Sequence, residues 1–149
     1  MKIKLIFHYI SYLQYPLMIF AIYFVLKPYF NGFENTDEIL KDLNSMLVFL
    51  GLGISFSTLQ DTTKTQNKMS EKIWKNPKKG KMAIFSILFL TLFLIIIGLV
   101  GYFSTNDSKL KDLSIGIIIL GIGLIGMLKT AVEMFENYRK DKNTTANTV

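Results

Sequence analysis

The chain of 149 residues contains no cysteine and only one histidine. Without cysteine there is no disulfide, no thiolate nucleophile and no thiolate-bound metal. A single histidine excludes a metal centre built from several imidazoles. Neither a Ser-His-Asp set nor a pair of buried carboxylates stands out in the sequence. We therefore expect a protein without enzymatic activity and without a cofactor or metal.

Charged residues are also scarce. They make up 19% of the chain, whereas 50% of the residues are hydrophobic and 13% are aromatic, and the mean hydropathy is +0.35. The apolar residues occur in long blocks, more than the core of a small soluble domain can bury. This composition excludes a disordered chain and most soluble folds, and it predicts an integral membrane protein.

Four segments approach the length of about 20 mostly apolar residues that a membrane-crossing helix needs. The third segment is the strongest, because it carries no charge from Met82 to Phe103. The fourth is short unless Lys111 and Lys129 extend their side chains to opposite interfaces. The first has a basic start but no small-residue cleavage site, so we expect it to be kept as a membrane anchor. The predicted spans are 5–26, 39–59, 82–103 and 111–132.

These spans predict an all-α membrane protein with four transmembrane helices in an up-down antiparallel bundle. Residues 1–142 form one membrane domain, and 143–149 form a disordered tail rich in Thr and Asn. Short polar turns should make neighbouring helices antiparallel. We expect Pro16 to kink the first helix, Pro28 and Gly32 to end it, and Thr36 to cap the second.

The second and fourth helices are predicted to extend beyond the membrane. No glycine or proline occurs between Gln60 and Ile73, and lysines repeat there every four residues, so the second helix should continue to about Asn76. An apolar stripe that includes Ala131 and Phe135 continues the fourth helix. We expect the two extensions to pack together, with Trp74 at the membrane interface.

Most of the 17 basic residues lie near the N-terminus, in the connection 60–81 and after residue 128. The positive-inside rule then places both termini and this connection in the cytoplasm, in an inner (plasma) membrane. The lysines of the connection are expected to contact anionic lipid headgroups. Nucleic acid is not an expected partner, since no base-reading motif accompanies the charge. These candidate headgroup contacts are Lys64, Lys68, Lys72, Lys75, Lys78, Lys79 and Lys81.

Glycines mark two candidate packing faces. Gly121, Gly123 and Gly126 match the dinucleotide pattern GxGxxG, but they lie within a span and follow no strand, so we interpret them as helix-packing positions. Gly116 shares a face with Gly123 and Gly126. In the second span, Gly51 and Gly53 each precede a serine by four residues, a spacing typical of close helix contacts.

A polar stripe follows the second span through Asn44, Ser55, Thr58 and Thr62. Either it packs and hydrogen-bonds against another helix, or it lines a water-filled path. Because no ring of charge accompanies it, packing is favoured. The sequence thus predicts a structural, assembly or accessory-subunit role, with a homo-oligomer or another membrane protein as partner. The alternative is a homo-oligomeric ion channel lined by the second helix.

Overall fold

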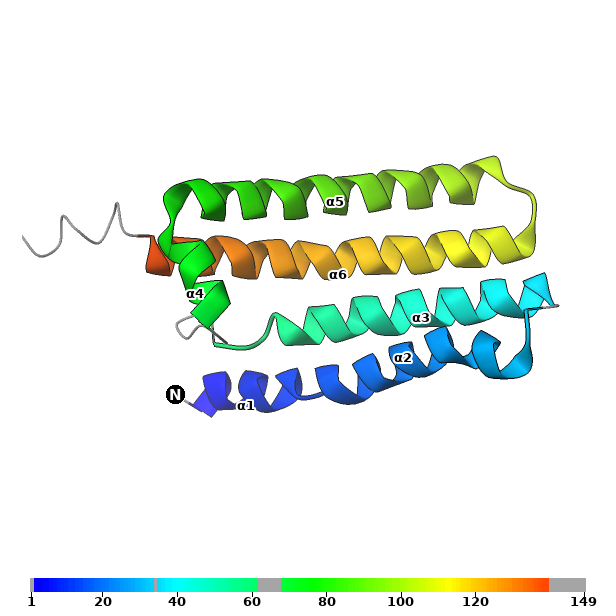
Figure 1. The fold of residues 1–149 in the computed structure, drawn as a ribbon, viewed down its shortest axis with the longest axis horizontal. Coiled ribbons are helices and arrows are strands. Elements are labelled where there is room, and N and C mark those ends of the chain that lie inside the picture. Colours follow the sequence, from blue (N-terminus) through cyan, green and yellow to red (C-terminus); the bar gives the residue numbers. More distant parts are fainter. Residues whose placement is uncertain (1, 34, 62–67, 140–149) are drawn as a thin grey trace, which may run out of the picture.

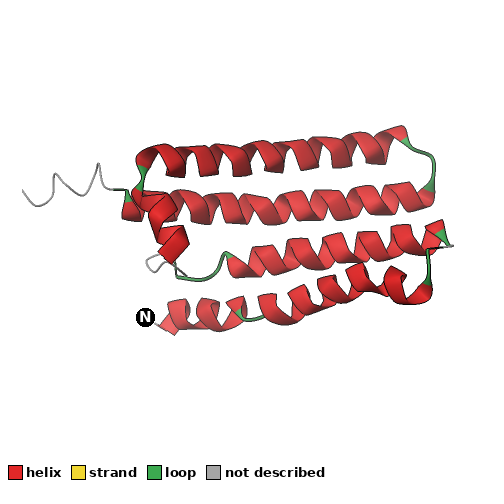
Figure 2. Ribbon diagram, viewed as in Figure 1, coloured by secondary structure: helices red, strands yellow, loops and turns green. Residues whose placement is uncertain are grey.

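The computed structural model describes residues 2–33, 35–61 and 68–139, and within these ranges it is all-helical and has no strand (Figures 1 and 2). Four helical stretches are long and apolar enough to cross a membrane, which confirms the all-helical class and the number of candidate spans. The predicted tail 143–149 lies outside the described residues. The helices are α1 Lys2–Ser11, α2 Gln14–Asn31, α3 Thr36–Ser57, α4 Lys68–Lys75, α5 Pro77–Ser104 and α6 Ser108–Tyr138.

The four long helices lie side by side in the order α2, α3, α6, α5 (Figure 1). Consecutive long helices alternate in direction, as predicted, and α2 packs on α3 while α5 packs on α6. The central pair α3 and α6, however, runs parallel. Among the described residues α2 and α5 make no extensive contact, so the helices form an open row.

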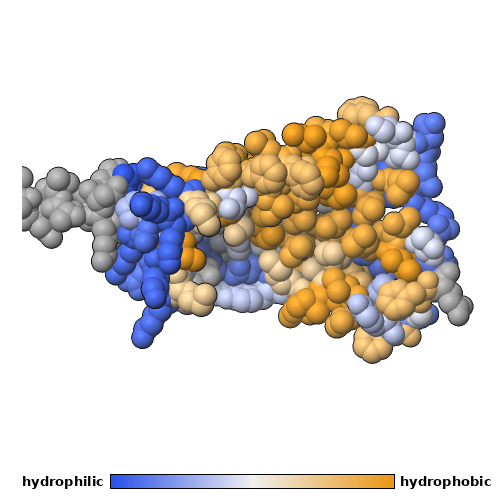
Figure 3. Space-filling view, turned by 45° about the horizontal axis from the view of Figure 1, so that its top comes forward, coloured by the Kyte–Doolittle hydropathy of each residue, from blue (hydrophilic) through white to orange (hydrophobic). Residues whose placement is uncertain are grey.

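Polar residues gather at the two ends of this row, and a broad apolar band separates them (Figure 3). One end holds α4 together with the start of α1 and the end of α6, and we call it the α4 end. The opposite end, the loop end, holds the α2–α3 and α5–α6 connections. The predicted grouping of the 60–81 connection with both ends of the chain is therefore present within the described residues.

The first span is interrupted at Tyr12 and Leu13, which separate α1 from α2. Pro16 has no N–H to donate to the Tyr12 carbonyl, and the Tyr15 N–H takes over this bond at 3.1 Å. The expected kink is thus present and locally satisfied. The expectation for Pro28 was wrong: it lies inside α2, which continues to Asn31 and ends before Gly32, where φ is +86°.

Short polar side chains start the other long helices. The Asn35 side chain accepts a hydrogen bond from the Asp37 N–H at 3.1 Å, so Asn35 caps α3 in place of the predicted Thr36. Asn76 accepts from two N–H groups at the start of α5, where Pro77 is the first residue. The Asp107 carboxylate accepts from the Lys109 N–H at 2.8 Å and caps α6.

The predicted continuation of the second helix was wrong, because α3 ends at Ser57. The hydroxyls of Ser57 and Thr58 donate to backbone carbonyls of α3, each at 2.7 Å. The following N–H groups of Leu59 and Gln60 bond to carbonyls three residues back, which tightens the last turn. The lysine repeat instead lies partly in the separate helix α4. The continuation of the fourth helix, in contrast, is confirmed as far as Tyr138.

Candidate functional site

The centre of the molecule is a close contact between α3 and α6, which we call the seam. Gly51 and Gly123 face each other there, and a Cβ added to Gly123 would collide with the Gly51 carbonyl oxygen. A Cβ on Gly51 would lie 2.8 Å from the Ile119 carbonyl oxygen and 2.9 Å from the Leu120 Cα. Backbone therefore meets backbone, an approach that only glycine permits.

The seam continues in both directions from Gly51. Toward the loop end, Asn44 lies against Gly116, and its Oδ1 is the one buried side-chain oxygen without a hydrogen-bond partner in the described part of the chain. Toward the α4 end, the side chain of Thr58 lies 3.1 Å from the place of a Gly126 Cβ. Two residues of the predicted polar stripe, Asn44 and Thr58, and the glycine face on α6 thus lie on the two sides of one intrachain contact.

Three contacts across the seam join residues that have the same separation in sequence. The Thr130 hydroxyl lies within hydrogen-bond distance of two carbonyl oxygens, that of Gly126 at 3.2 Å and that of Thr58 across the seam at 3.4 Å, and Thr58 and Thr130 are 72 positions apart. The pairs Asn44–Gly116 and Gly51–Gly123 have the same separation. Equivalent positions meet in this way across the axis of a parallel helix pair. Thr130 was missed from the sequence, although its place seven residues after Gly123 was a usable signal.

Not all the predicted packing residues belong to the seam. Gly53 faces the Met18 side chain of α2, with 3.2 Å from an added Cβ to the Met18 Cε. The Ser55 hydroxyl donates to the Gly51 carbonyl within α3 at 3.0 Å. Gly121 faces Ile95 of α5. The three glycines of the GxGxxG pattern therefore point to two neighbouring helices. Thr62 lies outside the described residues.

The α5–α6 contact uses two glycines that the sequence interpretation had not singled out. A Cβ on Gly98 would lie 2.6 Å from the Ile118 Cγ1, and one on Gly101 would lie 2.5 Å from the Ser114 Oγ. Ser114 is buried and satisfies its hydroxyl through the Leu110 carbonyl at 2.7 Å. The spacing of these glycines is three residues, which helix geometry places on neighbouring positions of one face.

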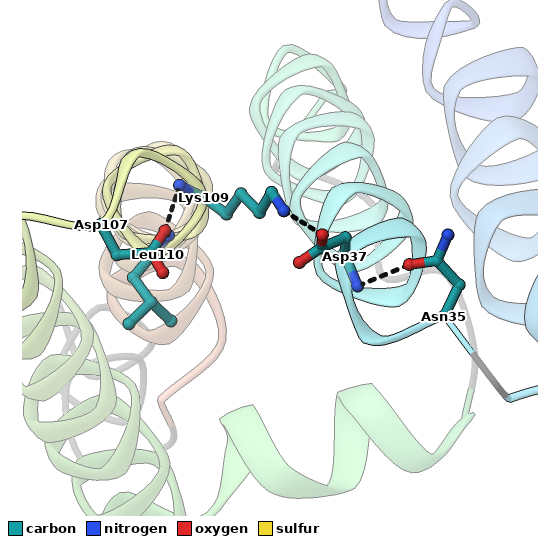
Figure 4. Close-up of polar contacts among 5 residues, drawn as sticks. All are labelled: Asn35, Asp37, Asp107, Lys109 and Leu110. Carbon is teal, nitrogen blue, oxygen red and sulfur yellow. Dashed lines mark hydrogen bonds and ion pairs between the residues drawn. The ribbon is translucent and has the colours of Figure 1, made fainter.

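The seam opens at the loop end into a hollow of about 370 Å³. An ion pair between Lys109 and Asp37 joins α6 to the start of α3 beside this hollow (Figure 4). Both side chains are about half exposed. The lining mixes three acids, two lysines and two small polar residues, with no histidine or cysteine. These residues are Asp37, Glu38, Lys41, Asn44, Ser45, Lys109 and Asp112.

A second ion pair at this end is much more buried. Lys27 of α2 and Asp42 of α3 lie 2.8 Å apart, and the Asp42 side chain is only 6% exposed. Few carboxylates are buried to this degree without a paired cation. The pair ties the two helices together near their connection, and the sequence interpretation did not identify it. Its residues are 15 apart in the chain, which no short-range pattern reveals.

The α4 end carries the described lysines of the 60–81 connection. α4 lies crosswise to the long helices (Figure 1), and the Lys68, Lys72, Lys78, Lys79 and Lys81 side chains are exposed. Lys75 is half-buried and pairs with Glu71 at 2.5 Å. This hydrogen bond and charge lower the pKa of Glu71, so the carboxylate stays ionised and offsets one lysine. Lys64 lies outside the described residues.

Trp74, for which the sequence suggested a place at the membrane interface, is buried on the inner side of α4. It packs in a cluster with Ala131 and Phe135 of α6, and its indole N–H donates to the Ser70 hydroxyl at 2.9 Å. Gly80, in the first turns of α5, lies against the Phe135 ring. The predicted contact between the connection and the end of the fourth helix is therefore made by α4.

No protein-family model, curated protein or solved structure matches this chain. Within residues 2–33, 35–61 and 68–139, no group of His, Cys, Asp or Glu side chains is arranged to hold a metal ion. The function is therefore inferred from the seam, the two polar ends and the apolar band.

Proposed function

We propose that this protein is a small multi-pass protein of the inner membrane with a structural, assembly or accessory-subunit role and no enzymatic activity. The observation that carries this proposal is the contact of Gly51 with Gly123. Asn44 and Thr58, two residues of the polar stripe that would have to line a conducting path, lie against Gly116 and Gly126 of α6 in the same chain. The alternative of a channel lined by the second helix loses its main support.

The distribution of polar groups also supports a structural role. The two ion pairs that join α2 to α3 and α3 to α6 both lie at the loop end of the row. Between the ends, α5 buries only Gly80, Thr91 and Gly98, so most of its length is an apolar surface for lipid or for a partner protein. A rigid seam with apolar outer helices suits an assembly subunit better than a catalyst.

The accessibility of introduced cysteines distinguishes a packed face of α3 from a water-filled path lined by that face. Leu47 also faces α6, since its Cβ lies 3.2 Å from the place of a Gly116 Cβ. Cysteines introduced as Leu47→Cys and Ser55→Cys should react at least about tenfold more slowly with a small charged thiol reagent than Asn106→Cys in a connection, because thiolates form where water reaches. Rapid reaction at positions 47 and 55, or ion flux from proteoliposomes of the purified protein, would make the channel the better proposal.

The proposed orientation has a separate test. If the lysine-rich α4 end is cytoplasmic, then in intact cells an impermeant reagent should label Asn106→Cys but not Lys68→Cys. Permeabilising the cells should expose position 68. The reverse labelling pattern would invert the topology, and labelling of both positions in intact cells would contradict membrane insertion.

A further inference from the structure

Six lysines and one glutamate lie between residues 68 and 81, in α4 and the start of α5. We call the lysines of this segment the α4 collar. At the loop end, by contrast, lysines and acids are mixed and form the pairs Lys27–Asp42 and Lys109–Asp37. The excess positive charge is therefore confined to one end of the apolar band. The α4 collar consists of Lys68, Lys72, Lys75, Lys78, Lys79 and Lys81.

The collar is held in a fixed position by packing on its inner side. Trp74 is 9% exposed and contacts the end of α6, and Gly80 lies against Phe135. Since these contacts take up the inner face of α4, the lysines are directed away from the long helices. α4 also lies crosswise (Figure 1), an orientation that places it along the plane of a membrane spanned by the others.

Exposed apolar side chains accompany the lysines. Met69 is 76% exposed and Met82 is 73% exposed. A hollow of about 350 Å³ lies at the α4–α5 corner, lined by Lys72, Lys75, Asn76 and Pro77. Lysines next to exposed methionines are typical of a surface that meets both the headgroups and the upper acyl chains of a bilayer.

We propose that the α4 collar binds anionic phospholipid and that the corner hollow receives its phosphate, between Lys72 and Lys75. Charge complementarity favours this occupant, because the collar has five more lysines than acids and faces the edge of the apolar band. Membrane insertion, as proposed above, is a precondition. The collar would then anchor one end of the protein in a leaflet rich in anionic lipid.

The sole tryptophan of the chain, Trp74, lies within α4 and serves as the probe. In nanodiscs of the full chain, energy transfer from Trp74 to dansyl-labelled phosphatidylglycerol should exceed transfer to dansyl-labelled phosphatidylcholine at the same fraction. The double variant Lys72→Gln with Lys75→Gln should lower the apparent affinity for the anionic lipid about tenfold, because each lysine near such a surface contributes a several-fold effect.

Two matched variants test the assignment of the site. Glu71→Gln removes the only acid of the segment and should increase transfer to the anionic lipid. Lys109→Gln with Lys111→Gln, at the loop end, should leave it unchanged. An unaltered Trp74 emission maximum checks that each variant keeps the α4–α6 contact.

Equal transfer to both lipids, or an equal loss from the loop-end variant, would overturn the proposal while leaving the seam and the membrane topology intact. Suppression of the transfer by millimolar inorganic phosphate would also overturn it, in favour of a site for free phosphate. Failure of the protein to enter nanodiscs at all would instead contradict the proposed function.

Discussion

Replacing Gly123 with alanine should push α3 away from α6 and lower the free energy of unfolding by about 1–3 kcal/mol. The added Cβ would collide with the Gly51 carbonyl oxygen, a backbone atom that cannot rotate away. Alanine is otherwise the better helix former by about 1 kcal/mol, so a loss of stability would have to come from the contact itself. Unfolding of the purified protein in detergent, followed by Trp74 fluorescence, measures the change.

Gly53→Ala is the matched control for this substitution. It adds the same methyl group to α3, where the nearest atom is the Met18 Cε at 3.2 Å, at the end of a flexible side chain. We expect it to be neutral or stabilising by up to about 1 kcal/mol. Equal destabilisation by Gly53→Ala and Gly123→Ala would show that the seam is no tighter than other helix contacts, and the structural account of α3 and α6 would fail.

Replacing Lys27 with methionine should destabilise the fold by about 2–4 kcal/mol, because it leaves the Asp42 carboxylate buried without its partner. Asp42 is 4% exposed as a residue, so water cannot take the place of the lysine. The same unfolding experiment measures the loss. Adding Asp42→Leu to Lys27→Met should recover part of the lost stability, since the unpaired charge is then removed.

Lys109→Met provides the control, because Lys109 also forms an interhelical pair with an aspartate. The Lys109 and Asp37 side chains are 48% and 60% exposed, and solvent screens their interaction. We expect a cost of about 0–1 kcal/mol. A larger cost for Lys109→Met than for Lys27→Met would mean that burial does not decide the contribution of these pairs.

The all-helical class and the number of helices long and apolar enough to cross a membrane were predictable from the sequence for a local reason. Crossing a bilayer requires continuous apolar segments, and such segments are visible without knowing what they contact. The kink before Pro16 was equally local, since it follows from a missing N–H at one position. Lysine segregation likewise predicted which connections share an end of the molecule, and the structure places them so.

Predictions that relied on a repeat or on one breaker residue were less secure. The four-residue lysine spacing suggested one helix through 60–76, but Ser57 and Thr58 bond back to the carbonyls of α3 and end it first. Pro28 lacks the N–H that would donate to the carbonyl four residues earlier, yet α2 continues past it to Asn31. Hydrogen bonds from side chains to the backbone compete with continuation of a helix, and the spacing of residues in the sequence does not reveal them.

The sequence by itself determined the apolar blocks, the polar ends and the faces of the helices on which glycines and small polar residues gather. Only the tertiary structure decided which faces meet. It joins Gly51 to Gly123 in a parallel pair at the centre of the row, directs Gly121 to α5, and buries Trp74 against α6. The physical reason is that a small-residue face permits a close approach by any helix of suitable shape. The choice among partners depends on the packing of residues far apart in the chain.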